Sequence, residues 1–66
     1  MNDLRVLRRP EVLAKTGQST STLYDRMARG EFPRPVRIGT NSVAWIEREV
    51  NDWLLARIAE RDGEAA

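Results

Sequence analysis

The sequence predicts a mainly α-helical domain with a small β-hairpin, built from three helices and two or three short strands. Helix-start and helix-stop residues bracket two short segments before residue 30, and a proline-rich stretch with a Gly/Asn turn follows them. An apolar stripe with helical spacing then occupies residues 46–58. Sixty-six residues suffice for one domain with a thin core. We therefore expect a single domain over residues 1–66, with frayed ends at 1–3 and 62–66.

A short strand and a short helix are the first elements expected. Residues 4–7 favour an edge strand. Pro10 suits the first turn of a helix, because its fixed φ is already helical and its missing N–H is not needed there. Glu11 is favourable near the positive end of that helix. The helix should end at about Thr16, where Gly17 can adopt the left-handed conformation of a C-cap.

The second helix is expected at residues 20–29. Ser19 can cap it, since its hydroxyl can accept from an N–H two or three residues later. Leu23 and Met27 lie four residues apart and should face the core, and Gly30 ends the helix. About two residues separate this helix from the first, so the two must cross sharply. The segment therefore predicts a helix-turn-helix.

A β-hairpin, or wing, is expected at residues 36–45. Two prolines keep residues 32–35 out of a helix. Short alternating runs on either side of a Gly-Thr-Asn-Ser turn then predict two paired strands. Val36 and Ile38 are expected to face the core, so that Arg37 between them points outward. Trp45 is expected in the core.

The third helix is expected from Glu47 to about Arg61. Acidic residues crowd its first turn and arginines its last, which complements the helix dipole. Trp53 belongs to its apolar stripe and should pack in the core. Leu55 and Ile58 lie at the edge of the stripe, where they either close the core or contact a second subunit.

Composition excludes several function classes. The chain has no cysteine and no histidine, which removes disulfides, thiolate metal sites and the commonest general base and zinc ligand. It also lacks a phosphate-cradling glycine loop and an evident pair of catalytic carboxylates. We expect neither an enzyme nor a cofactor. No run approaches the ~20 apolar residues of a membrane span, and the N-terminus lacks a signal-peptide pattern, so we expect a soluble cytoplasmic protein.

Charge is distributed unevenly along the chain. Residues 1–45 carry a balance of +4 and residues 46–66 a balance of −3, which gives the net charge of +1. A chain whose first part is basic and whose last part is acidic can present its basic side to a polyanion such as double-stranded DNA. Ordinary mixed surface charge is the alternative at this point.

The outer side of the second helix carries short hydroxyl side chains, one tyrosine and one aspartate. Such a surface can approach a DNA groove closely, N-terminal end first, and can donate hydrogen bonds to phosphates or base edges. The wing adds arginines that can clamp flanking phosphates or enter a minor groove. The candidate DNA contacts are Ser19, Thr20, Ser21, Tyr24, Asp25, Arg26, Arg29, Arg34, Arg37, Thr40 and Asn41.

Each of these residues also has a purely structural interpretation. Ser19 is first of all a helix cap. Tyr24 can be half-buried against the wing. Asp25 can accept from a cytosine amino group, orient an arginine, or form a plain surface ion pair with one. Asn41 can simply be the residue that tolerates a positive φ in the turn.

A further set of features lies within residues 7–54: Pro10-Glu11-Val12, Gly17, Ser21-Thr22-Leu23-Tyr24, Gly30, Phe32-Pro33, Pro35, Val36-Arg37, Gly39, Trp45, Glu49-Val50 and Trp53-Leu54. Through these features the chain resembles the AlpA family of prophage regulatory proteins, within the wider group of winged-helix excisionases and MerR-like DNA-binding domains. The resemblance implies a DNA-binding winged helix-turn-helix. The family pattern has an apolar residue where this chain has Gln18, and commonly a basic one where it has Asp25.

The function predicted from these features is a sequence-specific transcriptional regulator of prophage or genomic-island genes. Residues 20–29 would enter the major groove, and the wing at 36–45 would lie on the flanking backbone or minor groove. The alternative is an excisionase that bends attachment-site DNA and recruits an integrase; a protein-interaction module is a third hypothesis. One module buries only about 600–1,000 Å² on DNA, so a homodimer or cooperative oligomer is expected. An integrase or RNA polymerase is a further candidate partner, and a DNA-bound protein would be associated with the nucleoid.

Overall fold

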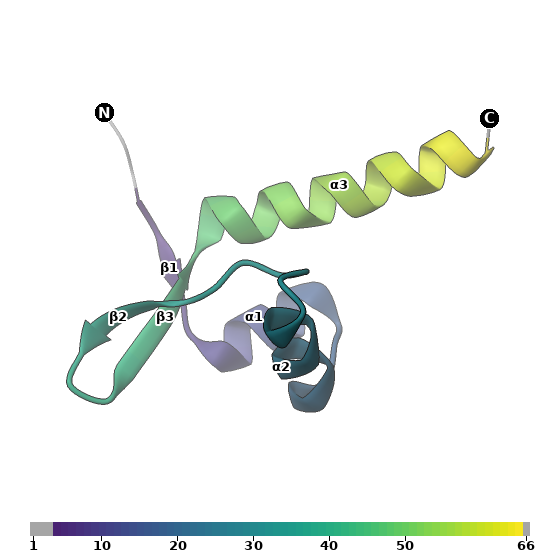
Figure 1. Ribbon diagram of the computed structural model, residues 1–66. Helices are drawn as coiled ribbons and strands as arrows, with labels where there is room; N and C mark the ends of the chain where they lie inside the picture. Colours follow the sequence, from purple (N-terminus) through teal and green to yellow (C-terminus); the bar gives the residue numbers. More distant parts are fainter. Residues whose placement is uncertain (1–3, 66) are drawn as a thin grey trace.

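The computed structural model describes residues 4–65 of the chain. It confirms the predicted fold class, a winged helix-turn-helix with three helices and a small antiparallel sheet (Figure 1). In Figure 1, α1 and α2 lie together below α3, while the hairpin projects to one side and α3 extends away to the other. The elements are β1 (Val6–Leu7), α1 (Arg9–Thr16), α2 (Thr20–Ala28), β2 (Val36–Gly39), β3 (Ser42–Ile46) and α3 (Glu47–Ala65).

The sheet has the strand order β1-β3-β2, so β1 lies at an edge as expected. Leu7 of β1 pairs with Trp45, and Val36 of β2 pairs with Ala44 on the same central strand. The pairing of β2 with β3 shifts register between Arg37 and Gly39, which marks an irregularity close to the turn. The sheet therefore links the start of the chain to the wing, and its central strand β3 continues directly into α3.

The core contains one or more residues from nearly every segment. Its buried members are Val12, Leu23, Phe32, Trp45 and Val50. Trp45 is fully buried, and its indole N–H donates to the Pro33 carbonyl oxygen at 3.0 Å. A buried indole needs such an acceptor, so this bond fastens the segment before the wing to the sheet. The core thus fixes the wing relative to the two short helices.

The turn between α1 and α2 has the predicted caps. Gly17 adopts φ 70°, and its N–H donates to the Leu13 carbonyl oxygen at 2.8 Å. The Ser19 hydroxyl accepts from the Thr22 N–H at 3.2 Å. Three residues separate the helices, because α1 ends at Thr16 and α2 begins at Thr20. These local bonds hold the two helices at a sharp angle and present α2 to one side of the molecule.

The prediction that Val36 and Ile38 face the core is wrong. They are 41% and 48% exposed, and every residue of β2 is exposed. The hairpin projects beyond the helices, so none of the elements within residues 4–65 covers this strand (Figure 1). Burial is concentrated instead on β3, where the consecutive residues Ala44 and Trp45 are both fully buried.

Helix α3 is longer than predicted. It continues to Ala65, so residues 62–65 are helical rather than frayed; residues 1–3 and 66 lie outside the described part of the chain. Its last turn therefore holds no basic residue, contrary to the prediction, because the arginines stand further back. Leu55 is 61% exposed and Ile58 is 45% exposed, so neither closes the core. The interpretation that Leu55 and Ile58 close the core of the monomer is therefore excluded.

Candidate nucleic-acid interface

Helix α2 divides into a buried side and an exposed side, as its sequence predicts. Leu23 is fully buried and Met27 packs against the core cluster. Thr20, Ser21 and Tyr24 are exposed on the other side. This exposed side, together with Asp25 and Ala28, is called the outer face of α2 below. It carries no long side chain in its first turn, so another surface can come close to the backbone there.

Ser19 stands at the start of this face and serves first as its cap. Besides accepting from the Thr22 N–H, its hydroxyl donates to Thr22 Oγ1 at 3.0 Å. The residue nevertheless remains exposed. Its structural role is therefore satisfied within the chain, and a phosphate contact would be additional to it.

Asp25 and Arg29 form an ion pair on the outer face. Their closest oxygen and nitrogen atoms are 2.9 Å apart, and the side chains are 56% and 62% exposed respectively. A pair this exposed contributes little to stability. The surface ion-pair interpretation of Asp25 is confirmed, and the pair also holds the Arg29 guanidinium at the end of α2.

Arg26 differs from the other predicted contacts, because its guanidinium has partners within the chain. Its guanidinium donates to Gln18 Oε1 at 2.6 Å and lies 5.3 Å from the centre of the Trp53 ring. The residue is partly buried, because its position on α2 turns it toward α3 rather than outward. Gln18 supplies the acceptor. Arg26 thus links the helix-turn-helix to α3.

The predicted wing contacts are all exposed. Arg37 lies on β2, Thr40 and Asn41 form the turn, and Arg34 precedes the hairpin. No residue other than glycine has a positive φ within residues 4–65, so the conformational explanation for Asn41 fails. Its side chain is available at the tip.

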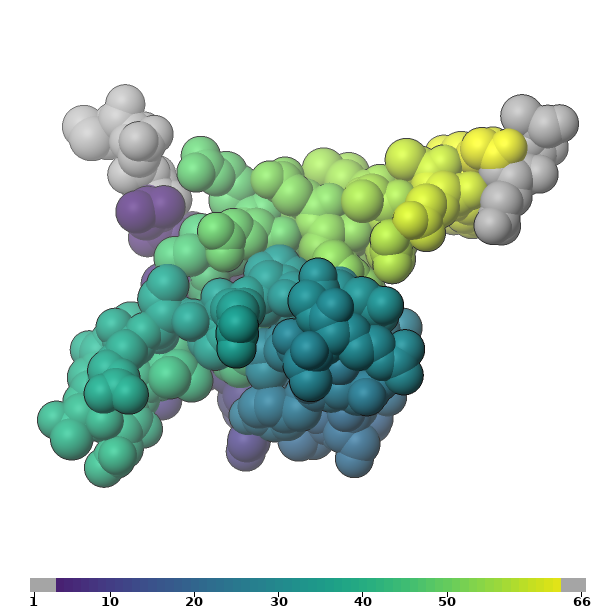
Figure 2. Space-filling view, viewed as in Figure 1, coloured from purple at the N-terminus to yellow at the C-terminus, as the bar shows by residue number. Residues whose placement is uncertain are grey.

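Two hollows lie on either side of Tyr24. One, of about 440 Å³, separates the start of α1 from the wing; we call it the α1–wing hollow. The other, of about 430 Å³, lies between α2 and the segment before the wing, and is lined by Arg34 and Pro35. Figure 2 shows the notch between the projecting hairpin and the helices. The residues lining the α1–wing hollow are Arg8, Arg9, Pro10, Tyr24, Asn41, Val43 and Trp45.

Arg8 and Arg9 are members of this surface that sequence reasoning missed. They were counted only as part of the basic first part of the chain, whereas the structure places them beside Tyr24 and Asn41. Arg9 Nη1 donates to the Tyr24 hydroxyl at 3.5 Å. The available signal was two adjacent arginines directly before Pro10, because a helix start brings such residues to one end of the helix.

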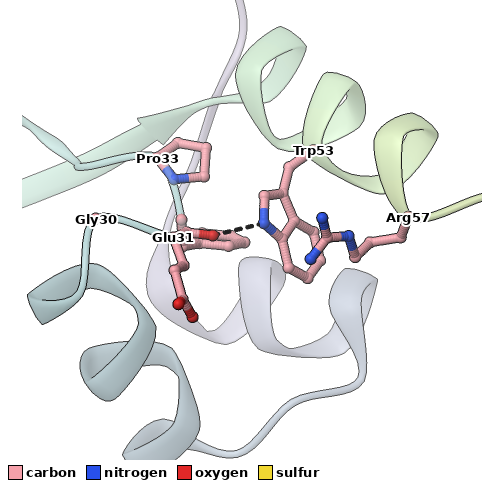
Figure 3. Close-up of a pocket in the computed structure, with 6 residues that line it drawn as sticks. Gly30, Glu31, Pro33, Trp53 and Arg57 are labelled. Carbon is pink, nitrogen blue, oxygen red and sulfur yellow. Dashed lines mark hydrogen bonds between the residues drawn. The ribbon is translucent and has the colours of Figure 1, made fainter. Parts of the chain in front are cut away.

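A third hollow, of about 610 Å³, lies away from the outer face of α2 (Figure 3). None of the predicted contacts lines it. The Trp53 indole N–H donates to the Glu31 carbonyl oxygen at 2.8 Å, and the Arg57 guanidinium lies 5.1 Å from the indole ring centre. These contacts attach the segment after α2 to α3. The residues that line this hollow therefore have a structural role.

Residues 4–65 hold no group of three or more acidic, histidine or cysteine side chains arranged for a metal ion. Within the same residues, none of the helices has the length and apolar character required to traverse a bilayer.

Comparison with known proteins identifies the family. Residues 5–58 match the family model of the prophage CP4-57 regulatory protein (AlpA). The chain is 47% identical over 57 residues to the uncharacterized protein ORF88 of Enterobacteria phage P4, a match covering 86% of this chain but only 65% of the phage protein. The chain therefore spans less than two thirds of that relative.

A second relative is the DNA-binding transcriptional activator AlpA of Escherichia coli K12. It is 38% identical over 60 residues, which cover 82% of this chain and 86% of the relative. The family match extends over most of the chain and includes the helix-turn-helix, the wing and the first part of α3. The chain belongs to the AlpA family of prophage regulatory proteins.

Proposed function

We propose that this protein is a DNA-binding transcriptional regulator of prophage or genomic-island genes. One observation carries the proposal most directly. Tyr24, on the exposed side of α2, lines two hollows whose charged lining residues are all arginines: Arg8 and Arg9 in one, Arg34 in the other. Membership of the AlpA family, and the name of the E. coli relative, support the same function.

The dimensions and chemistry of α2 suit the major groove. An α-helix with its side chains is about 10–12 Å across, and the groove of B-DNA is about 12 Å wide. Short side chains at Thr20 and Ser21 let the N-terminal turn approach base edges. The hydroxyls can donate to bases or phosphates, while Tyr24 can donate to a phosphate and pack its ring on a sugar.

The arginines around α2 are available to phosphates. Within the described residues, the ion pairs involve Arg5, Arg29, Arg57 and Arg61. The arginines of the two hollows and of β2 belong to none of these pairs. A polyanion placed against the two hollows and β2 therefore meets cations that have no carboxylate to give up, which favours both affinity and fast association; Arg29, by contrast, is paired with Asp25.

DNase I footprinting on DNA flanking the chain's own gene, coupled to a promoter reporter, tests the proposal. A regulator should protect a discrete site at a promoter and change reporter output. Tyr24→Ala should abolish protection, whereas Arg61→Ala, a change at the far end of α3, should retain it. A wild-type protein that protects no site and leaves every reporter unchanged would refute the proposal.

The excisionase function is the second candidate and uses the same groove contacts. Several adjacent protected repeats, DNA bending and stimulated excision by an integrase would favour it over the regulator. Either function needs more contact than a single module provides, and a second copy is the partner we propose for the exposed Leu55 and Ile58. A protein-interaction module would instead use the α3 side and show no salt-sensitive affinity for DNA.

A further inference from the structure

We infer that the α1–wing hollow seats one phosphodiester group of the DNA backbone, held by Arg9 and Tyr24 with Arg8 and Asn41 beside them. The inference rests on the proposed function and deepens it. It assigns a ligand to a hollow whose two arginines the sequence pattern did not mark as contacts, and it gives Tyr24 a defined chemical role.

The hollow joins three elements that are distant in sequence. Arg8 and Arg9 come from the start of α1, Tyr24 from the middle of α2, and Asn41 from the turn of the wing. Its volume of about 440 Å³ leaves ample room for a phosphate with part of its sugar. A group bound here would contact both parts of the proposed reading surface at once.

The polar groups of the hollow all suit an anion. The Tyr24 hydroxyl accepts from Arg9 Nη1 at 3.5 Å, and its own proton finds no acceptor among the residues that the structure describes. That proton, the guanidinium N–H groups and the Asn41 amide are donors that a phosphate oxygen can accept from. The 3.5 Å separation is long for a hydrogen bond. A phosphate oxygen that bridges the two side chains could accept a shorter hydrogen bond from each of them.

Charge in the hollow is uncompensated. No carboxylate lines it, and no ion pair within residues 4–65 includes Arg8 or Arg9. Two acids are close along the chain to residues that line the hollow. Glu11 accepts from the Arg8 backbone N–H at 2.8 Å and is thereby held at the start of α1, and Asp25 is paired with Arg29 at 2.9 Å. The hollow therefore attracts negative charge while the adjacent helix end is already capped.

A seated phosphate would fix the register of α2 in the groove. Contacts to phosphate position a protein on the duplex, whereas base contacts supply specificity. Removing the seat should therefore weaken binding to all sequences by a similar factor. Base preference, which depends on the outer face of α2, should stay the same.

The test combines protein variants with neutral phosphates. Wild type, Arg9→Ala and Tyr24→Phe are titrated with the footprinted duplex, in which single phosphates are replaced in turn by methylphosphonate. At one position the replacement should weaken wild-type binding about tenfold, as expected for a charge-assisted hydrogen bond. Arg9→Ala should weaken binding by a similar factor, and at that position the methylphosphonate should then weaken binding clearly less than it does for wild type, because one of the charged donors is already missing.

Arg61→Ala is the matched control, because it removes the same charge from an exposed site on α3. It should retain the full methylphosphonate effect. Circular dichroism verifies that each variant is folded. Additive losses from Arg9→Ala and every methylphosphonate would overturn the phosphate seat while leaving the proposed function intact. Absence of any wild-type complex with DNA would overturn both.

Discussion

At the scale of single residues, Ser19 illustrates how one hydroxyl organises the proposed reading helix. Replacing Ser19 by Ala removes the acceptor of the Thr22 N–H, which should lower the free energy of unfolding by about 1 kcal/mol. Urea denaturation followed by circular dichroism measures the change. Ser19→Asp should retain most of the stability, because aspartate is an equally good cap. Equal losses for the two variants would show that the cap is not what stabilises α2.

Arg37 gives a second prediction at this scale, concerning charge rather than folding. The residue is exposed on β2 and belongs to no ion pair within the described residues. If it neutralises one phosphate, Arg37→Ala should reduce the slope of log Kobs against log salt concentration by about 0.9. Fluorescence anisotropy at several salt concentrations gives this slope. An unchanged slope would remove Arg37 from the interface, and Arg61→Ala serves as the charge-matched control.

Single residues also show where sequence reasoning reaches its limit. The cap at Ser19 and the burial of Trp45 were predictable, because each depends on local pattern. The position of Arg26 was not predictable. A helical wheel of α2 does not show that α3 lies beside this helix, where the Trp53 ring contacts the Arg26 guanidinium. The role of Arg9 was not predictable for the same reason. Its neighbour Tyr24 is 15 residues away along the chain and contacts it only in the folded protein.

At the scale of elements, the turn between α1 and α2 depends on one backbone conformation. Gly17 has a φ of 70° and open space around the position of a Cβ, so Gly17→Ala introduces backbone strain without a clash. We expect the free energy of unfolding to fall by about 1 kcal/mol or more. Gly63→Ala, inside α3 and without a positive φ, should not lower stability, since alanine favours a helix. Thermal denaturation of both variants checks this, and a loss for Gly63→Ala matching that for Gly17→Ala would contradict the assignment.

The elements were predicted to different degrees. Proline, glycine and serine mark the ends of α1 and α2 locally, so their bounds agree with the structure to within a residue. The wing was located correctly, but the exposure of Val36 and Ile38 was not, because alternation alone does not say whether any element covers a strand. The extension of α3 was missed because Gly63 resembles a helix end, although the helix continues through it.

At the scale of the whole molecule, the exposed apolar residues of α3 are the surface that we propose for contact with a second copy. Leu55 and Ile58 lie three residues apart on one side of the helix and are largely exposed. Replacing both with glutamate should abolish self-association without unfolding the domain. Apparent affinity for a multi-site duplex should fall by roughly 10²-fold, because linked binding events are lost. Sedimentation velocity and titration measure the two effects. A monomeric wild type that binds DNA without cooperativity would exclude this surface as the subunit contact.

We propose that the outer face of α2, the wing turn and the start of α1 form one DNA-binding surface. Cross-saturation from duplex protons to the backbone amides of deuterated protein tests it most directly, because the signal requires contact. We expect attenuation at Arg8, Arg9, Thr20, Ser21, Tyr24, Thr40 and Asn41, and none at residues 57–62 of α3. Attenuation confined to α3, with unaffected amides on α2 and the wing, would contradict it.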